Sequence, residues 1–240
     1  MKYALVTGSS SGIGLAIAEK LLTEGCFVFV NHFPGEDTTA VEDNLNLRFP
    51  GQYSLIPADL SGFDGLDALC GKTEASCKAL DYLVLNAGAT ERGSLDDITP
   101  ESWNRVISVN LTIPVFLVQR LHRLIPEHGR IVFIGSKMGI LPHGMSLSYS
   151  VSKAGVNFLA QSLVKFFEGR NITVNAIAPG FVDTPWQKHK PPEIRQSIES
   201  KVALHRFAQP AEIGDLCWHI IQNEYLNGSV ISIDGGYCYR

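Results

Sequence analysis

The stretch Tyr3-Ala4-Leu5-Val6-Thr7-Gly8-Ser9-Ser10-Ser11-Gly12-Ile13-Gly14 decides the fold. A short apolar run leads into a turn of glycine and serine, and residues 13–24 then carry apolar side chains at helical spacing before Gly25. This order predicts a strand, a loop and a helix. Such a loop lets the backbone approach a phosphate, which the unpaired N–H groups of the helix amino terminus can bind. The spacing Gly-x-x-x-Gly-x-Gly differs from the common Gly-x-Gly-x-x-Gly, so an ordinary glycine-rich turn is the alternative.

Further apolar runs alternate with segments of helical period along the rest of the chain. The predicted strands are residues 3–7, 27–31, 53–58, 82–86, 130–134, 172–177 and 230–233. Long helices are predicted over about 99–125 and 148–168. The alternation predicts an α/β single-domain Rossmann fold over residues 1–240, with a doubly wound seven-stranded parallel sheet and helices on both faces. Residues 183–207, rich in proline and polar side chains, break the pattern, and we expect a substrate lid there.

Composition narrows the class of protein. The chain has 240 residues, 45% hydrophobic and 18% charged, and 20 Lys plus Arg against 24 Asp plus Glu give a net charge of −4. This balance argues against a nucleic-acid partner. The 5 cysteines are scattered without metal-ligand spacing, so no metal site and a reducing cytoplasmic location are expected. Apolar runs are too short for a signal peptide or a membrane span.

Three side chains near the fifth predicted strand suggest acid–base chemistry. Ser136 follows that strand, and Tyr149 and Lys153 stand four residues apart on a predicted helix, hence on one face. A cation near a phenol lowers the pKa of the phenol, as proton exchange with a ketone or alcohol oxygen requires. Ser136 can hold the same oxygen. Taken singly, each residue also has a structural explanation: a turn serine, a packed tyrosine or a lysine reaching solvent.

Two further motifs end predicted strands at the same edge of the sheet. Asn86-Ala87-Gly88 follows the fourth strand, where small residues permit close approach of a ligand. Asp59 follows the third strand and can accept a hydrogen bond from an adenine amino group. A simple turn and a helix cap near Ser61 are the alternatives for these two positions.

Together these residues resemble the short-chain dehydrogenase/reductase family, in its short single-domain branch, over nearly the whole chain. The motifs that carry the resemblance are Thr7-Gly8-x-x-x-Gly12-x-Gly14, Asp59, Asn86-Ala87-Gly88, Asn110, Ser136, Tyr149-x-x-x-Lys153, Pro179-Gly180 with Thr184, and Ile233-Asp234-Gly235-Gly236. The chain departs from many members by having Leu85 before Asn86. The Tyr-x-x-x-Lys spacing also differs from the enoyl reductase branch and favours C=O over C=C chemistry.

The resemblance implies roles for individual residues. Ser136 would orient the substrate carbonyl, and Tyr149 would be the general acid and base. Lys153 would hold the nicotinamide ribose and tune Tyr149, while Asn110 would support a water that relays protons. The implied cofactor contacts are Gly8, Ser10, Ser11, Gly12, Ile13, Gly14, Asn31, His32, Asp59, Leu60, Asn86, Ala87, Gly88, Tyr149, Lys153, Pro179, Gly180, Val182 and Thr184.

The cofactor is expected to be NADP or NAD. Family members that prefer NAD carry a carboxylate at the end of the second strand, where this chain has His32. Members that prefer NADP carry a basic residue at one of two positions, which are Phe33 and Ser11 here. Because Asn31 and His32 can donate hydrogen bonds, we favour NADP. Glu36 and Asp37 follow closely and can reverse that preference.

The resemblance implies hydride transfer between nicotinamide and a ketone or secondary alcohol, with 3-oxoacyl-thioester reduction as one candidate. Sugar, polyol or steroid dehydrogenation, epimerisation or dehydration through a keto intermediate, and a non-catalytic nucleotide-binding role are the alternatives. The family also implies a homo-oligomer, a tetramer or dimer, acting on a small molecule. Candidate substrate contacts are apolar (Met138, Ile140, Leu141, Met145, Leu147, Trp186) or basic (Lys188, His189, Lys190, Arg195), with a solvated lid face as the alternative for the basic group.

Overall fold

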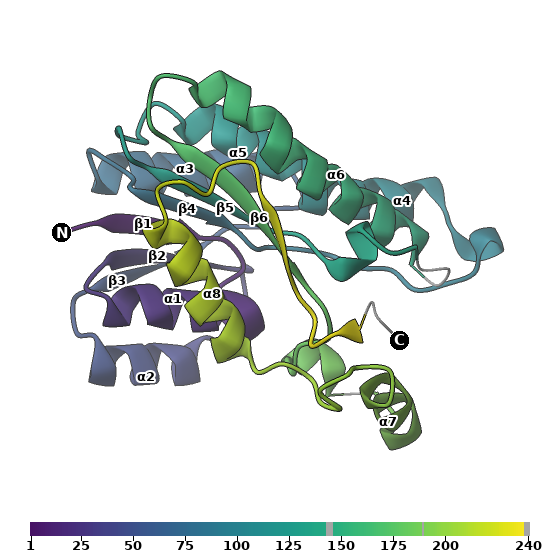
Figure 1. Ribbon diagram of the computed structural model, residues 1–240. Helices are drawn as coiled ribbons and strands as arrows, with labels where there is room; N and C mark the ends of the chain where they lie inside the picture. Colours follow the sequence, from purple (N-terminus) through teal and green to yellow (C-terminus); the bar gives the residue numbers. More distant parts are fainter. Residues whose placement is uncertain (143–145, 189, 238–240) are drawn as a thin grey trace.

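The computed structural model describes residues 1–142, 146–188 and 190–237. Its centre is a parallel sheet of 7 strands, as predicted, and the strand order is β3-β2-β1-β4-β5-β6-β7 (Figure 1). The strands are β1 (Tyr3–Val6), β2 (Phe27–His32), β3 (Tyr53–Pro57), β4 (Tyr82–Leu85), β5 (Arg130–Ile134), β6 (Thr173–Pro179) and β7 (Val230–Ile233). The chain moves outward from β1 to β3 and returns to β4 beside β1, so a topological switch point lies between β1 and β4.

Helices cover both faces of the sheet (Figure 1). They are α1 (Gly12–Thr23), α2 (Thr39–Arg48), α3 (Phe63–Ser76), α4 (Pro100–Ile107), α5 (Ile113–Leu121), α6 (Leu147–Leu163), α7 (Pro192–Glu199) and α8 (Pro210–Gln222). Short helical turns are η1 (Leu95–Asp97), η2 (Ser108–Thr112), η3 (Lys137–Gly139), η4 (Val164–Phe167) and η5 (Pro185–Gln187). No helix in the described part of the chain is long and apolar enough to cross a membrane.

The strands are apolar along their length because each contributes to two cores. In β1, Leu5 packs in the cluster under α3, α5 and α6, whereas Ala4 and Val6 pack in the cluster under α1, α2 and α8. Successive side chains of a strand point to opposite faces, and a parallel sheet covered on both faces needs apolar side chains on each. This explains why the sequence shows short continuous apolar runs.

The predicted helix over 99–125 is interrupted. Thr99 caps α4 by accepting a hydrogen bond from the Ser102 N–H, but the chain then widens into the π-helical turn η2 before α5 begins. Pro114 lies at the start of α5 and has no N–H to offer the Asn110 carbonyl, so regular α-helical bonding cannot continue through this point. The predicted helix over 148–168 is likewise α6 followed by the tighter turn η4.

The segment 183–207 forms η5 and α7, which stand beyond the sheet (Figure 1). Arg195 in α7 fixes the segment, because its Nη atoms donate to both Asp183 carboxylate oxygens at 2.9 and 3.1 Å. Its Nε donates to Glu199, and its guanidinium lies 4.3 Å from the centre of the Phe207 ring. Arg195 therefore stabilises the segment 183–207 through these contacts. Of the two interpretations of the basic group, a role in the lid itself fits Arg195 better than substrate binding.

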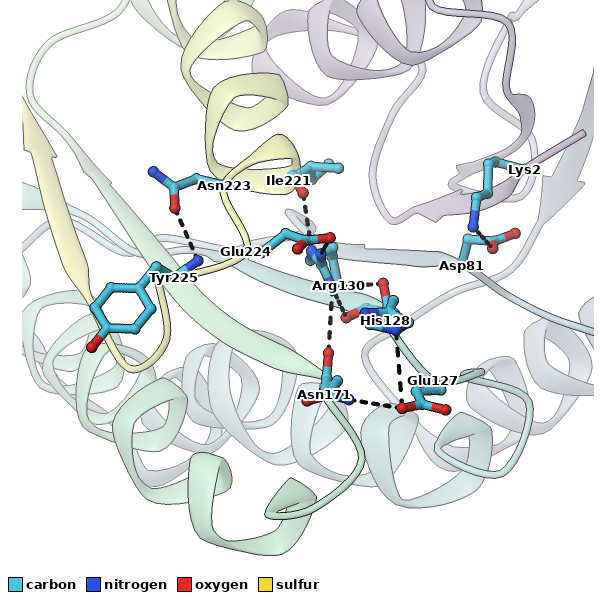
Figure 2. Close-up of polar contacts among 11 residues, drawn as sticks. Lys2, Asp81, Glu127, His128, Arg130, Asn171, Ile221, Asn223, Glu224 and Tyr225 are labelled. Atoms are coloured by element: carbon cyan, nitrogen blue, oxygen red, sulfur yellow. Dashed lines mark hydrogen bonds and ion pairs between the residues drawn. The ribbon is translucent and has the colours of Figure 1, made fainter.

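The amino edge of the sheet is held by a buried arginine at the start of β5. Figure 2 shows Arg130 surrounded by polar groups from the loop before it, the end of α8 and the turn before β6. Nε donates to the Ile221 carbonyl at 3.0 Å, and Nη1 donates to the His128 and Gly129 carbonyls at 2.6 and 3.1 Å. Glu224 is an exposed ion-pair partner at 3.6 Å. The guanidinium of Arg130 thus donates hydrogen bonds to backbone carbonyls that have no donor within the helix and the strands.

We predict that Arg130→Met lowers the free energy of unfolding by about 3 kcal/mol, because it leaves buried carbonyls without donors. Glu224→Gln is the matched control, and its effect should stay below about 1 kcal/mol because the carboxylate is exposed. Denaturant unfolding of both variants provides the measurement. Equal losses of stability would show that the ion pair, and not the carbonyl network, supports this edge.

Candidate active site at the carboxyl edge of the sheet

Hydrogen bonds hold the glycine loop against the end of β4. The Thr7 hydroxyl accepts hydrogen bonds from the Asn86 and Ala87 N–H groups, both at 2.9 Å. In return, the Asn86 side-chain amide donates to the Thr7 and Gly8 carbonyls at 3.0 and 2.8 Å. A Cβ at Gly14 would collide with the Gly8 carbonyl and this same amide. Glycine at position 14 therefore lets α1 pack directly onto the loop.

The amino terminus of α1 is open towards the same edge. Ser11 is its N-cap residue but makes no side-chain capping bond, and the first turn contains no acidic residue. Backbone N–H groups at a helix start lack helical partners and carry the positive end of the helix dipole. With Ser11, Gly12 and Ile13 lining the adjacent cavity, this terminus is suited to an anionic group such as a pyrophosphate.

A cavity of about 670 Å³ runs from the glycine loop to the predicted catalytic residues. Its described lining comprises Gly8, Ser10, Ser11, Gly12, Ile13, Asn31, Phe33, Glu36, Ala58, Asp59, Leu60, Ser61, Asn86, Ala87, Gly88, Ala89, Arg105, Val109, Ile134, Gly135, Ser136, Tyr149, Lys153, Pro179, Gly180, Val182, Thr184, Pro185, Trp186 and Gln187. This volume is typical of a cofactor site. One continuous space thus joins the phosphate-binding loop to the acid–base residues.

Tyr149 and Ser136 meet inside this cavity. The Ser136 hydroxyl hydrogen-bonds the Tyr149 side chain, and Ser136 itself is buried after β5. Burial raises the pKa of Tyr149, and the bond from Ser136 offsets this only in part. The sequence predicts a phenol pKa lowered by Lys153, but burial determines the direction of the shift in this structure. The phenol therefore keeps its proton at neutral pH, as a proton donor to a carbonyl oxygen requires.

Lys153 lies one turn further along α6 and is 4% exposed. Its Nζ donates to the Ile134 carbonyl at 2.7 Å and lies 5.7 Å from the centre of the Tyr149 ring. Burial lowers the pKa of the lysine to about 8. A lysine with this pKa is largely charged at neutral pH but loses its charge only slightly above it.

Asn110 is buried in η2 and is not among the described residues that line the cavity. Its Oδ1 accepts from the Ala89 N–H at 2.7 Å, and its Nδ2 donates to the Ala89 carbonyl and to the Ser152 hydroxyl, both at 2.9 Å. Ser152 in turn donates to the Tyr149 carbonyl. Asn110 thus connects the loop after β4 to the helix that carries Tyr149 and Lys153.

The structure places the predicted cofactor contacts along the cavity, with two exceptions. Gly14 lies beneath the glycine loop. His32 is also absent from the described lining; it is buried, with Nδ1 3.0 Å from the Phe33 carbonyl. Asn31 lines the cavity, but its amide donates to three backbone carbonyls, of His32, Ile56 and Ala58. The donors on which the NADP preference rested are therefore engaged in the fold.

Asp59 lines the cavity at the end of β3, and its Oδ1 accepts from the Ser61 N–H at 2.9 Å. This bond closes the turn before α3, whose N-cap residue is Gly62. At the opposite side, the Gly180 N–H donates to the Ile233 carbonyl, which fixes the loop containing Thr184. Thr184 is close enough to Gly12 that a Cβ there would lie 3.2 Å from its methyl group. The loop after β6 therefore closes over the glycine loop.

Several lining residues were not predicted. Some, such as Ser61 and Gly135, simply flank predicted positions and follow from strand ends that all reach one edge. Arg105 and Val109 come from α4 and η2, which the sequence does not connect to this edge. Among the candidate substrate contacts, Trp186 lines the cavity, whereas Met145 and His189 lie outside the described residues. No cluster of three metal-ligating side chains occurs among the residues described.

Comparison with known proteins agrees with this geometry. The family model described as short chain dehydrogenase matches residues 2–195. The chain belongs to this family. Short-chain dehydrogenases are oxidoreductases that act on CH–OH or C=O groups with a nicotinamide cofactor, and the chain is one of them.

Relatives of this short-chain dehydrogenase resemble it along almost their whole length. Nodulation protein G of Azospirillum brasilense is 32% identical over 243 residues, covering 100% of this chain and 99% of the relative. The 3-oxoacyl-[acyl-carrier-protein] reductase FabG of Thermotoga maritima is 32% identical over 240 residues, covering 98% and 97%. The crystal structure of the angucycline C-6 ketoreductase LanV with bound NADP has a TM-score of 0.91 and 31% identity, covering 100% of this chain and 96% of that one.

We predict that Gly14→Ala weakens cofactor binding at least tenfold, because the added methyl group pushes α1 away from the loop. The matched control is Gly71→Ala in α3, where an added Cβ meets nothing within 4 Å. That control should bind normally and gain up to about 1 kcal/mol of stability from helix propensity. Titration calorimetry with NADP⁺ measures the effect, and unchanged binding by Gly14→Ala would contradict the packing argument.

The pKa of Lys153 predicts an alkaline limit to activity. Lysine is charged below its pKa, so the cation is lost as pH rises through about 8, while Tyr149 stays protonated because its pKa is raised. We expect kcat/KM for the reduced cofactor, which reports groups of the free protein, to fall above about pH 8. Lys153→Arg, whose guanidinium stays charged, should lose this limit in its remaining activity. A parent profile flat to pH 10 would refute the assignment.

Proposed function

We propose that the chain reduces a ketone to a secondary alcohol, or catalyses the reverse oxidation, with NADP(H) or NAD(H). The observation that carries this proposal is the single cavity joining the open amino terminus of α1 to Ser136, Tyr149 and Lys153. An extended dinucleotide needs a phosphate-binding site at one place and proton-transfer residues near its nicotinamide. The continuous cavity provides the first at the start of α1 and the second at Tyr149.

In this mechanism the protein handles the proton and the geometry. A bound nicotinamide supplies the hydride in reduction and accepts it in oxidation. The Tyr149 hydroxyl donates its proton to the carbonyl oxygen as negative charge develops there, and the Ser136 hydroxyl holds the same oxygen. The Lys153 ammonium stabilises the phenolate left on Tyr149 and holds the nicotinamide ribose. Asn110 keeps the loop after β4 and the helix of Tyr149 in register.

The residues present fit a nicotinamide dinucleotide. Glycine at position 14 and the uncapped start of α1 provide the pyrophosphate site, and Asp59 and Val109 line the cavity beside it. The Thr184 loop closes the opposite side. The structural neighbour LanV has bound NADP, which supports NADP for this chain as well.

A 3-oxoacyl thioester is the first substrate to test. Several relatives over nearly the full length are 3-oxoacyl-[acyl-carrier-protein] reductases, including those of Thermotoga maritima and Escherichia coli, each 32% identical. The apolar Trp186 at the cavity wall suits an acyl chain or another apolar ketone. The angucycline C-6 ketoreductase LanV supports a wider panel of ketones.

The direct test follows oxidation of NADPH and NADH by absorbance with a 3-oxoacyl thioester, a keto sugar, a steroid ketone and a diketone. Tyr149→Phe should lower turnover at least about a hundredfold, the scale of a lost general acid, and leave cofactor binding within about threefold. Tyr225→Phe, which alters a side chain that is 98% exposed, is the matched control and should keep full activity.

Two outcomes would contradict the proposal. Full turnover by Tyr149→Phe would remove the phenol from the mechanism. Substrate conversion without net cofactor consumption would instead favour epimerisation or dehydration through a keto intermediate.

We further propose that the chain forms a homo-oligomer in the cytoplasm. Phe158 on α6 and Phe166 in η4 are 70% and 79% exposed, so an apolar surface lies on the helix that carries Tyr149. We expect a second copy of the chain to cover it in a dimer or tetramer. Cys26, Cys70 and Cys217 are buried free thiols whose pKa values burial raises, which suits a reducing cytoplasm.

We predict that Phe158→Asp converts the oligomer to smaller species, because a carboxylate cannot be buried unpaired at an apolar interface. Leu47→Asp is the matched control, since Leu47 is 84% exposed on α2, away from α6. Light scattering coupled to size exclusion gives the mass of each. A monomeric parent chain would refute the assembly.

A further inference from the structure

A buried ion pair lies beside the turn η3, which begins at Ser136. The Lys137 Nζ lies 3.1 Å from Asp234 Oδ2 and donates to the Ser232 hydroxyl at 3.2 Å. The two charged side chains are only 10% and 9% exposed. Lys137 directly follows Ser136, whereas Ser232 belongs to β7 and Asp234 follows that strand. The pair therefore connects the end of β5 to the end of β7.

The connection passes the end of the strand that lies between them. In the sheet β6 separates β5 from β7, so the Lys137 side chain reaches past the end of β6 to meet Asp234. There a Cβ on Gly180 would lie 2.9 Å from Asp234, and the Gly180 N–H donates to the Ile233 carbonyl at 2.9 Å. Pro179 and Gly180 both line the cavity. The ion pair thus holds three strand ends together beside the site.

The turn η3 is fixed from two flanks. Its own bonds are local, because the Ser136 hydroxyl accepts from the Met138 N–H at 3.1 Å and the Ser136 carbonyl accepts from the Gly139 N–H at 3.0 Å. On one flank Gly139 packs directly on α6, where an added Cβ would collide with the Lys153 backbone. On the other flank Lys137 ties the turn to β7.

A charged pair gives this second flank a defined geometry. Burying two charges costs free energy, and apolar residues of similar volume often stabilise a fold equally well. Apolar contact, however, has no preferred direction, whereas an ion pair with a hydrogen bond fixes the separation and orientation of its groups. The contacts of Lys137 with Asp234 and Ser232 therefore hold η3 in one position relative to β7.

We propose that Lys137 is a positioning residue for ketone reduction, which it supports by holding Ser136 in place through the ion pair with Asp234. The inference rests on the proposed function, in which the hydroxyls of Ser136 and Tyr149 hold one substrate oxygen. Because Ser136 has to meet that oxygen within hydrogen-bond distance, a small shift of η3 misaligns the carbonyl. Lys137 itself is not among the described residues that line the cavity.

The test measures reduction of the panel ketone that the parent chain turns over fastest, using Lys137→Met with and without the Ser136→Ala substitution. Methionine keeps an unbranched side chain but carries no charge, so it breaks the pair. With Ser136 present, kcat should fall at least about tenfold, while the dissociation constant for NADP⁺ from calorimetry stays within about threefold. With Ser136→Ala in place, the same change should lower kcat by no more than about twofold, because the hydroxyl that Lys137 positions is already gone.

Asp234→Asn breaks the same pair from its other side and serves as the second variant if Lys137→Met does not fold. Asparagine keeps Oδ1, which accepts from the Gly236 N–H at 3.0 Å, and replaces only the oxygen that faces Lys137. Its kcat should fall in the same way, and again only where the Ser136 hydroxyl is present.

Lys2→Met is the matched control. It removes the 2.8 Å ion pair with Asp81, which joins the starts of β1 and β4 at the opposite edge of the sheet (Figure 2). This variant should keep kcat within about twofold in both backgrounds.

Two results would overturn the inference and leave the proposed function intact. One is an unchanged kcat in Lys137→Met and Asp234→Asn. The other is an equal fold-loss with and without the Ser136 hydroxyl, which would show that the pair supports the fold alone. A parent chain that reduces no ketone of the panel with either cofactor would overturn the proposed function and this inference with it.

Discussion

The site depends on the hydrogen bonds that join the end of β1 to the end of β4. Thr7 and Asn86 exchange bonds across the point where the strand order reverses. Crevices form at such switch points because the connections leave in opposite directions. In this chain hydrogen bonds also join the two strand ends. Gly14 has no side chain, so α1 packs directly against the residues that make these bonds. The phosphate end and the catalytic end of the cavity therefore keep a fixed relation to one another.

Burial then sets the chemistry at the catalytic end. The same low-dielectric surroundings disfavour both charged forms, so they raise the pKa of Tyr149 and lower that of Lys153. The result is a phenol that holds its proton beside an ammonium close to losing its own. Such a pair is suited to donating a proton to a carbonyl oxygen and stabilising the phenolate that remains. Asn110 supports the pair at a distance, through Ala89 and Ser152.

The sequence predicted the sheet, its parallel order and most of the cavity, because these follow from local patterns and from strand ends sharing an edge. It did not predict features set by contacts between distant segments. Pro114 interrupts the helical spacing of residues 99–125 and is a sequence signal that regular bonding ends there, whereas the bond of Asn110 to Ala89 beside η2 depends on a tertiary contact. Glu36 was recognisable by its charge, but its place in the cavity depends on a turn at Gly35.

The proposed reaction is direct hydride transfer between nicotinamide and a carbonyl carbon, with the proton supplied by the protein. Reduced cofactor carrying deuterium at the transferable position of nicotinamide C4 tests it, with mass spectrometry of the alcohol formed from the ketone panel. Direct transfer places one deuterium on the carbinol carbon for each cofactor oxidised. Product without deuterium, formed while the cofactor stays reduced, would contradict it.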